Sequence, residues 1–364
     1  MPHILFMIKT VTLYYINEEY IQMLKKCIYM LIFLIIPFLI PKEYGHASAS
    51  TADNMEVKGV WISYGDFEYA GLYNQSENNF RINSEKMFSK LDKRGFNTVY
   101  FHVRPFDDAI YPNSSFDWCT YISKKPLKYD ALSILIETAH KHNIKFHAWI
   151  NPYRITMDKI YNPAKKSTTK HIVKGVKEII ERYDVDGIHF DDYFYPSKSK
   201  GNKYYKVSKK KRMKNVNNMV KIVYSEIKSY NPDIQFGISP AGNVKYAKSI
   251  GCDVDTWLTC DGYVDYIIPQ IYWSDNYILN GRKKAMYSDT LDEWAGIGLG
   301  NVPVYTGLAL YKAGTKSSID RGWRRSDNIK KQIKLADIYG CQGYVMFSYK
   351  SIFTSAGKKE LKNL

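Results

Sequence analysis

The feature that most constrains the fold of this chain is a regular alternation of strand-like and helix-like segments after residue 55. The strand-like segments are short, rich in β-branched and aromatic residues, and bounded by polar residues or glycine. Eight of them lie at residues 56–64, 97–103, 144–150, 186–192, 234–239, 264–273, 302–310 and 343–349. Most are preceded by an amphipathic helical pattern, which favours parallel strands joined by helical crossovers.

Helical patterns occupy most of the segments between these strands. Residues 171–183 place their isoleucines and valines on one face, and Asp130 is positioned to cap the helix that follows it. We expect Ser84 to cap the first helix, which Gly95 would end. The segment between residues 273 and 302 has the weakest helical pattern, and no full helix is expected after the last strand.

Eight β-α units in about 300 residues have the size and rhythm of a (β/α)8 TIM barrel. An open, doubly wound sheet is the alternative α/β fold. No G-x-G-x-x-G loop follows any of the strand-like segments, so a nucleotide-binding crevice has no support. No low-complexity linker divides residues 56–364. We therefore predict one catalytic barrel domain over this range.

The first 49 residues have the pattern of a signal peptide. An apolar run at residues 28–41 follows Lys25 and Lys26, and Ala47-Ser48-Ala49 fits a cleavage site. The run is short for a membrane-spanning helix, which needs about 20 apolar residues. We predict a signal peptide over residues 1–49, with an uncleaved membrane anchor as the alternative. The protein would then be secreted or associated with the bacterial cell envelope.

The chain carries a formal net charge of +16. Nucleic acid is one partner that such a charge could indicate. However, basic runs such as residues 206–214 lie between apolar-periodic segments and are typical of solvated helix starts. For an exported protein, an anionic cell surface or wall polymer is the plainer partner. We predict no nucleic-acid binding, and membrane contact only through residues 1–49.

No metal or cofactor is predicted. Four cysteines follow residue 49: Cys119, Cys252, Cys260 and Cys341. They lack the spacing of metal ligands, so structural thiols or one disulfide are expected. His102, His147 and His189 come from separate strands without an H-x-H or H-E-x-x-H motif, which disfavours a catalytic zinc. A G-x-S-x-G nucleophile elbow is also missing from the sequence.

Polar side chains follow the carboxyl ends of several predicted strands, where TIM barrels hold their active sites. They are His102, Arg104, Asp107 and Asp108 after the second strand; His147, Trp149, Asn151, Tyr153 and Arg154 on the third; Asp191 and Asp192 on the fourth; and Gln270, Tyr272 and Trp273 on the sixth. A single polar strand end would carry little weight. Convergence of several predicts a site at this end of the barrel.

Strand alternation separates the two adjacent carboxylates, because successive side chains point to opposite faces. In "GIHFDD", Ile188 and Phe190 should pack outward, whereas His189 and Asp191 face the barrel axis. Asp191 is therefore the better candidate for a carboxylate beneath a substrate, and His189 is expected to be a buried hydrogen-bond partner. The same alternation predicts these inward side chains on the two preceding strands: His102, Arg104, His147, Trp149 and Asn151.

Seven stretches closely resemble, in order, the motifs of the bacterial family 10-like glycosyl hydrolases (the DUF187 group). They are "KGVWISYGDF", "GFNTVYFHVRPFDDAIYP", "FHAWINPYR", "VDGIHFDDYFYP", "KNVNNMV", "FGISPAGN" and "VDYIIPQIYW". The resemblance runs from about residue 56 to residue 350. It implies a (β/α)8 barrel, export and hydrolysis of glycans. Members of the group are associated with peptidoglycan glycan strands, including strands stripped of their peptides.

The fourth-strand motif is also similar to the D-G-x-x-x-D frame of several other barrel glycosidases. Asp186, Gly187 and Asp191 match that frame, in which the final aspartate is the nucleophile. Chitinase-like enzymes continue to an acidic residue two places on, where this chain has Tyr193. This departure disfavours a substrate-assisted chitinase mechanism.

The sequence thus predicts an exported glycoside hydrolase of N-acetylated peptidoglycan glycan that uses paired carboxylates and no cofactor. Asp191 is the first catalytic candidate, and its possible partners at strand ends are Asp192, Asp108 and Asp66. Adjacent residues rarely face each other across a sugar, so Asp108 has equal weight with Asp192. The predicted substrate-binding residues are His102, Arg104, His147, Asn151, Tyr153, Arg154, Tyr193, Gln270, Tyr272 and Trp273. The alternatives are a non-catalytic barrel that binds wall glycan, and a glycosidase for another extracellular polysaccharide.

Overall fold

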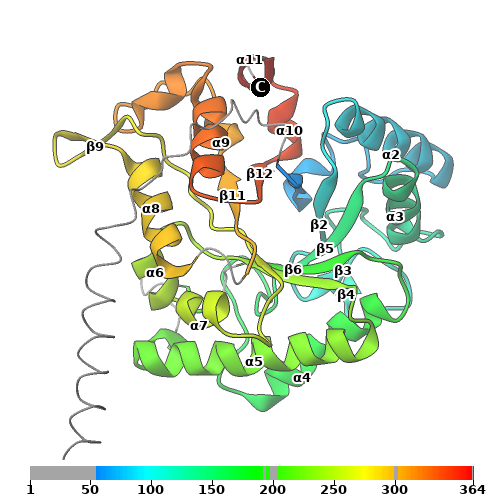
Figure 1. Ribbon diagram of the computed structural model, residues 1–364. Helices are drawn as coiled ribbons and strands as arrows, with labels where there is room; N and C mark the ends of the chain where they lie inside the picture. Colours follow the sequence, from blue (N-terminus) through cyan, green and yellow to red (C-terminus); the bar gives the residue numbers. More distant parts are fainter. Residues whose placement is uncertain (1–54, 192–193, 197–202, 299–301, 363) are drawn as a thin grey trace, which may run out of the picture. The chain divides into compact units, whose positions relative to one another are not determined.

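Eight parallel strands form one sheet that curves into a barrel (Figure 1). The computed structural model describes residues 55–191, 194–196, 203–298, 302–362 and 364, so the predicted signal peptide lies outside the described residues. In sheet order the strands are β11 (Tyr305–Leu308), β12 (Gly343–Phe347), β1 (Val57–Ile62), β2 (Thr98–Arg104), β5 (Lys145–Ile150), β6 (Gly187–Asp191), β7 (Gln235–Ser239) and β8 (Tyr266–Ile267). Each lies within one of the eight predicted segments, except that β2 extends one residue further, to Arg104.

Isolated bridges between β8 and β11 close the barrel. Ile267 pairs with Val304, and Gln270 pairs with Gly307, both in parallel orientation. The Gly307 N–H donates to the Pro269 carbonyl at 2.9 Å, next to these bridges. A doubly wound sheet would leave the two edge strands far apart, so that alternative is wrong. The predicted (β/α)8 barrel is confirmed.

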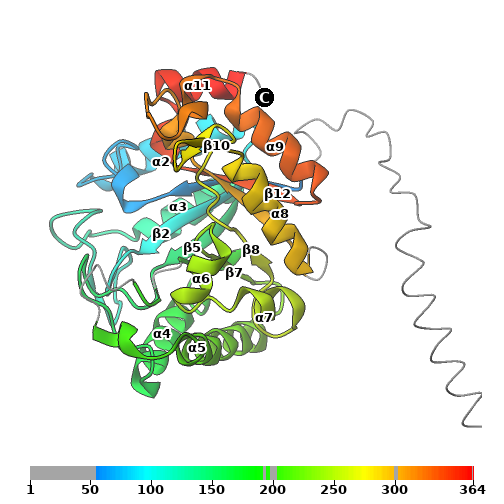
Figure 2. The same cartoon turned by 90° about the vertical axis from the view of Figure 1, so that its left-hand side faces the viewer.

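Helices cover the outer face of the barrel (Figures 1 and 2). They are α2 (Glu77–Asp92), α3 (Ala131–Lys141), α4 (Lys166–Ile180), α5 (Lys209–Tyr230), α6 (Val244–Ser249), α7 (Val254–Thr259), α8 (Met286–Gly298), α9 (Asn328–Ile338), α10 (Tyr349–Ile352) and α11 (Ser355–Lys362). Two short helices, α10 and α11, therefore follow the last strand, where no full helix was expected. Within the described residues, every helix is too short or too polar to cross a membrane.

The N-terminal caps of α3 and α2 can be compared with the two predicted capping residues, Asp130 and Ser84. Asp130 caps α3 as expected, because its carboxylate accepts from the backbone N–H of Leu132 at 3.1 Å. The Ser84 prediction is wrong: α2 begins at Glu77 and is capped by Ser76, whereas Ser84 is buried inside the helix. The first turn of α2 is polar, so the apolar pattern alone placed its start too late.

Three polar residues tie neighbouring strands together at the amino-terminal end of the barrel. Each directly precedes a strand and accepts the backbone N–H at the start of the strand beside it. The pairs are Asn97 with Lys58 (3.0 Å), Asp186 with Phe146 (2.7 Å) and Asp265 with Phe236 (2.7 Å). Asp186 thus has a structural role at the opposite end of β6 from Asp191.

A chain of hydrogen bonds crosses the barrel interior. Trp61 Nε1 donates to His189 Nε2 at 3.2 Å, and the Tyr266 hydroxyl lies 3.3 Å from His189 Nδ1 and 2.9 Å from His147 Nδ1. An indole N–H can only donate, so His189 Nδ1 carries the proton and donates to Tyr266, which donates to His147. Burial lowers the pKa of His189 well below its usual value and that of His147 to about 4, so both rings are neutral. His189 is therefore the buried hydrogen-bond partner that the sequence predicts.

The four described cysteines are thiols, and the one-disulfide alternative is wrong. Cys119, Cys252 and Cys341 are buried, Cys260 is exposed, and none of the four is bonded to another. Burial raises the pKa of Cys341 to about 12, which keeps that thiol protonated and unreactive at neutral pH. The three buried thiols behave as small apolar side chains.

We predict that the free energy of unfolding falls as the pH is lowered from 7 to 4. Burial lowers the pKa of His102, His147 and His189, so the unfolded chain binds protons that the folded chain excludes. For His147 the loss begins below about pH 6.5, the ordinary histidine value, and continues to its folded value of about 4. Each such histidine contributes a slope of at most about 1.4 kcal/mol per pH unit.

Denaturant unfolding of wild type and His147→Gln across this pH range measures the effect. The variant should show a shallower dependence on pH, by about one proton, because glutamine does not titrate. Equal slopes for the two proteins would mean that His147 is already protonated in the fold, contrary to the hydrogen-bond chain described above.

Candidate active site

A pocket of about 300 Å³ lies at the carboxyl-terminal ends of the barrel strands. It is lined by Trp61, Ser63, Tyr64, Gly65, His102, Trp149, Asn151, Arg154, Asp191, Ser239, Gln270, Tyr272 and Phe347. Its floor is continuous with the barrel interior, since Trp61 and Trp149 belong to the cluster of side chains that fills the barrel. This is the end of the barrel at which (β/α)8 enzymes hold their catalytic groups.

Asp191 is the only carboxylate among the described residues that line the pocket. It is the last residue of β6 and is partly exposed. Gln270 Nε2 donates to Asp191 Oδ1 at 3.3 Å and lies 2.9 Å from the Ser239 carbonyl. As predicted, Ile188 and Phe190 pack in the outer core, which leaves Asp191 on the inner face. The carboxylate is therefore held at the mouth of the barrel by a side chain from beyond β8.

Of the two other carboxylates that the sequence suggested, one lies outside the pocket and one is not among the described residues. Asp108, in the short strand β3 (Asp108–Ala109), accepts a hydrogen bond from the Phe106 N–H at 3.0 Å. Burial raises its pKa. Asp192, like Tyr193, lies outside the described residues. Asp192 thus stays a prediction, and the structure separates Asp108 from the pocket.

Asp66 forms part of the scaffold near the pocket. It ends the 3-10 helix η2 (Tyr64–Asp66) and is almost fully buried. Both of its carboxylate oxygens accept hydrogen bonds: from the Ser63 N–H (2.9 Å) and hydroxyl (2.7 Å), the Ser348 hydroxyl (2.8 Å) and the Lys350 N–H (2.9 Å). A carboxylate satisfied in this way joins the loop after β1 to the end of β12, which disfavours a catalytic role.

One wall of the pocket carries buried polar atoms without hydrogen-bond partners among the described residues. They are both ring nitrogens of His102, Trp149 Nε1 and Asn151 Oδ1. His102 stacks on Trp149 with ring centroids 3.6 Å apart. Burial lowers the pKa of His102 well below its usual value, which the nearby Asn151 amide only partly opposes. An unsatisfied buried polar group costs about 1–3 kcal/mol, so such a wall is more typical of a binding site than of a core.

Arg154 brings a positive charge to the same pocket. Its side chain is mostly buried, with the guanidinium carbon 5.2 Å from the centre of the Phe106 ring. Gln270 and Tyr272 line the side formed by the segment after β8. The pocket therefore combines one carboxylate, one guanidinium, two amides and several aromatic rings, as in a site that binds a polar ligand with flat apolar faces.

Arg104 points away from the pocket, so its predicted inward orientation is wrong. The pairing of β2 with β5 shifts register between His102 and Arg104, and this irregularity breaks the alternation. The Arg104 guanidinium carbon lies 3.3 Å from the centre of the Phe116 ring. A Cβ added to Gly175 in α4 would lie 1.7 Å from Arg104 Nη1, so the arginine occupies the space that this glycine leaves.

Three more predicted binding residues do not line the pocket. His147 is buried beneath it, in the hydrogen-bond chain with Tyr266. Tyr153 is fully buried in the outer core, edge-on to Phe194 at 5.9 Å. Trp273 is partly buried against the same core. Conversely, the site includes residues that were not predicted, from the ends of β1 and β12: Trp61, Ser63, Tyr64, Gly65 and Phe347. Attention to strand ends within "WISYG" and "MFSY" would have found them.

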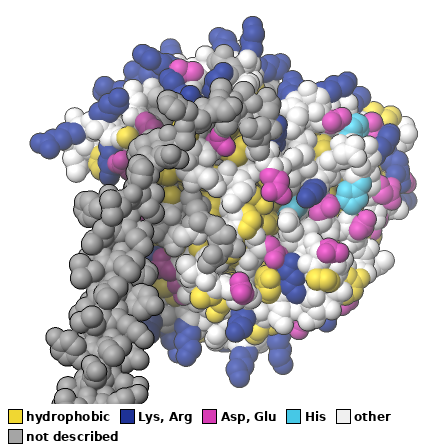
Figure 3. Space-filling model, in the orientation of Figure 1, with side chains coloured by type: hydrophobic (Ala, Val, Ile, Leu, Met, Phe, Trp, Pro, Cys, Tyr) yellow, Lys and Arg dark blue, Asp and Glu magenta, His cyan; other side chains and the backbone are white. Residues whose placement is uncertain are grey.

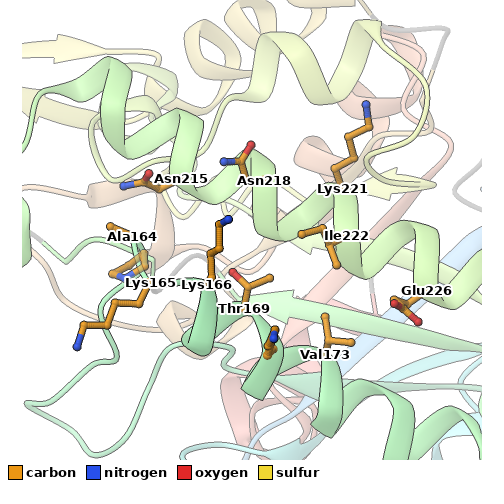
Figure 4. A pocket seen from close by; sticks show the side chains of 12 residues that line it. Ala164, Lys165, Lys166, Thr169, Val173, Asn215, Asn218, Lys221, Ile222 and Glu226 are labelled. Atoms are coloured by element: carbon orange, nitrogen blue, oxygen red, sulfur yellow. The ribbon is translucent and has the colours of Figure 1, made fainter.

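A larger cavity of about 510 Å³ lies outside the barrel, between α4 and α5 (Figure 4). Four lysines line it: Lys165, Lys166, Lys170 and Lys221. Glu226 is the only carboxylate among its described lining residues, and it lies 3.5 Å from Lys177. This cavity is remote from the strand ends and lacks a pair of carboxyl groups, so it is not a candidate for glycoside hydrolysis. No group of three or more His, Cys, Asp or Glu in the described parts of the chain could hold a metal ion.

Comparison with known proteins supports the barrel and its family. A solved glycoside hydrolase family 18 N-acetylglucosaminidase from Paenibacillus barengoltzii shares the fold, with a TM-score of 0.55 over 84% of this chain and 99% of that chain, at 9% identity. The glycosyl hydrolase YngK of Bacillus subtilis is 30% identical over an alignment of 366 positions. The alignment covers 84% of this chain and 70% of the relative.

The glycosyl hydrolase DigH of Escherichia coli K12 is 28% identical over 357 residues, 77% of this chain and 80% of the relative. The family described as Glycosyl hydrolase-like 10 matches residues 56–160 and 154–325, which include most of the pocket. The resemblance seen in the strand-end motifs is thereby confirmed. The chain belongs to the glycosyl hydrolase-like 10 family of glycoside hydrolases.

Proposed function

We propose that this protein is an exported hydrolase of N-acetylated cell-wall glycan strands, with Asp191 as a catalytic carboxylate. The observation that carries the proposal is the position of Asp191 at the end of β6, in a pocket walled by aromatic rings and unpaired polar atoms. Sugars present flat C–H faces and hydroxyl rims, which match such a wall.

Hydrolysis of a glycosidic bond requires a proton for the leaving oxygen and a carboxylate on the opposite side of the sugar, which attacks or activates water. Gln270 holds Asp191 at the pocket mouth, in a position to serve one of these roles. Asp192, the first residue after β6 and so outside the strand alternation, is the remaining sequence candidate for the second carboxyl group. Asp108 is disfavoured, because one of its oxygens is directed to the Phe106 backbone outside the pocket.

The chemistry of the pocket wall supports an N-acetylated substrate. An acetamido group has one N–H donor and one carbonyl acceptor. Trp149 Nε1 can only donate and Asn151 Oδ1 can only accept, and neither has a partner among the described residues. The pair is therefore complementary to an acetamido group. The fold relative named an N-acetylglucosaminidase supports the same class of sugar.

Two sequence features support the cell wall as the location of the substrate. Residues 1–49 have the pattern of an export signal, and the net charge of +16 favours an anionic envelope polymer. Peptidoglycan glycan strands combine N-acetylated sugars with carboxylates, so they satisfy both the pocket chemistry and the charge.

We predict that Asp191→Asn lowers the rate of glycan cleavage by about 10²–10⁴-fold while the protein stays folded and still binds glycan. New reducing ends released from purified peptidoglycan and from peptide-stripped glycan measure the rate. Asp108→Asn is the matched control and should keep most of the activity, because Asp108 does not line the pocket. If wild type binds glycan yet releases no reducing ends from any polysaccharide tested, the protein is a non-catalytic binding barrel instead.

A second prediction distinguishes His102 from His147, two of the three buried histidines of the barrel. His102→Phe keeps the stack on Trp149 and removes two unpaired nitrogens, so stability should stay the same or rise by about 1 kcal/mol. Activity should fall about tenfold or more, because the wall loses a polar contact with substrate. His147→Phe leaves the Tyr266 hydroxyl without its acceptor and should cost about 1–3 kcal/mol of stability.

Denaturant unfolding and kcat/KM, measured for both variants, test this contrast. If His102→Phe is destabilised as much as His147→Phe and its kcat/KM is unchanged, His102 is a structural residue rather than part of the binding wall.

A further inference from the structure

Two segments at the mouth of the barrel are joined into one unit beside the pocket. After β8, strands β9 (Tyr277–Leu279) and β10 (Arg282–Lys284) form a projecting hairpin (Figures 1 and 2). The second segment is the loop after β11, residues 309–327, which contains the 3-10 helices η5 (Leu310–Lys312) and η6 (Arg321–Arg324). The Ile278 N–H donates to the Ile319 carbonyl at 2.7 Å, and the Arg321 N–H donates to the Asn276 carbonyl at 2.9 Å.

Besides Arg325, which lies near Asp327, five exposed cations on this unit have no carboxylate partner in the described residues. We call them the basic rim: Arg282, Lys283, Lys316, Arg321 and Arg324. Figure 3 shows Lys and Arg side chains along the top and upper left of the molecule, the region of the hairpin, this loop and α11. Unpaired like charges at such density repel one another, and an anionic ligand would relieve that repulsion.

The hydrogen bonds of the loop hold two of these cations at its surface. Arg321 Nε donates to the Ser318 carbonyl at 3.1 Å, and Arg324 Nη2 donates to the Ser317 carbonyl at 2.8 Å. Asp320, the acid between the serines and the arginines, is buried and is 2.9 Å from Trp323 Nε1. The loop therefore buries Asp320 and exposes Arg321 and Arg324, while Asp327 at its end pairs with Lys331.

Aromatic rings connect the pocket to this loop. Tyr272 and Phe347 line the pocket, and the centroid of the Tyr311 ring lies 5.9 Å from each of theirs. Tyr311 is 47% exposed. Lys312 Nζ donates to the Tyr272 carbonyl at 2.6 Å, which fixes η5 against the pocket wall. The aromatic rings of Phe347, Tyr272 and Tyr311 thus form a continuous surface from the pocket to the loop that carries most of the basic rim.

We propose that Tyr311 and the basic rim bind the part of the glycan strand that extends out of the pocket, and that the rim selects strands with free carboxylates. This inference rests on the proposed function and adds a second determinant of specificity outside the pocket. A sugar ring would lie on Tyr311, and carboxylates further along the strand would pair with the guanidinium and ammonium groups. Wall glycan whose peptides have been removed exposes carboxylates at regular intervals.

The role of the basic rim is tested by measuring affinity for two ligands: peptide-stripped glycan, and the same glycan with its carboxylates amidated. All proteins compared carry Asp191→Asn, so that they bind glycan without cleaving it. Lys316→Gln/Arg321→Gln/Arg324→Gln should weaken binding to the carboxylate form about fivefold to tenfold, and binding to the amidated form by less than twofold. Lys174→Gln/Lys209→Gln/Lys214→Gln is the matched control. It removes three exposed lysines from α4 and α5 and should leave both affinities unchanged.

The aromatic contact is tested separately. Tyr311→Ala should weaken binding to both forms of the long glycan, and Tyr311→Phe should restore it, because a phenyl ring keeps the stacking surface. Oligosaccharides short enough to fill only the pocket should bind both variants as they bind the parent protein. Thermal unfolding checks that Tyr311→Ala is still folded, because the variant loses the ring contacts with Tyr272 and Phe347.

Three outcomes would overturn the inference: equal affinities for the rim variant and its parent, equal losses on the two forms of glycan, or displacement of glycan by a phosphate-bearing wall polymer or anionic vesicles at lower concentration. Binding is measured with an inactive protein, so this test is independent of catalysis. Failure of wild type to cleave glycan would instead reject the proposed function.

Discussion

The structure depends on the neutral hydrogen-bond chain that fills the barrel, from Trp61 through His189 and Tyr266 to His147. Its members come from four strands, β1, β6, β8 and β5, so one set of contacts fixes strands that are distant in sequence. A buried imidazolium would be costly in this environment, so this set of hydrogen bonds requires His189 and His147 to stay neutral. It closes the barrel beneath the pocket, and a ligand can then enter only from the carboxyl-terminal end.

The next layer of side chains toward the carboxyl-terminal ends of the strands differs from this hydrogen-bonded layer in how its polar atoms are paired. In the lower layer, Trp61 Nε1, both ring nitrogens of His189 and Nδ1 of His147 have partners. In the upper layer, both ring nitrogens of His102, Trp149 Nε1 and Asn151 Oδ1 have none among the described residues. A protein core rarely leaves such groups unpaired, whereas a binding site uses them for its ligand. Along the barrel axis, this change from paired to unpaired polar atoms coincides with the start of the pocket, although the buried Ser84 and Tyr153 hydroxyls outside it also lack partners in the described part of the chain. Asp191 stands at that boundary, beside Gln270.

Most of the fold could be predicted from the sequence, because strand and helix periodicities differ and both recur along the chain. The inward position of Asp191 followed from simple alternation on a regular strand. Alternation failed at Arg104, where a register shift that leaves no clear sequence signal turns the side chain toward α4. It also gave no guidance past the strand ends, so Tyr153 and Trp273 were placed in a cleft although they pack in the outer core.

The most direct test of this account is a crystal structure of the Asp191→Asn protein with a bound oligosaccharide of N-acetylated wall glycan. We expect the sugar in the pocket at the carboxyl-terminal mouth, its acetamido group against Trp149 and Asn151. Residue 191 should lie within about 3 Å of the anomeric carbon, the glycosidic oxygen or a water poised for attack. An oligosaccharide bound instead in the cavity between α4 and α5, with the pocket empty, would contradict the assignment of the site.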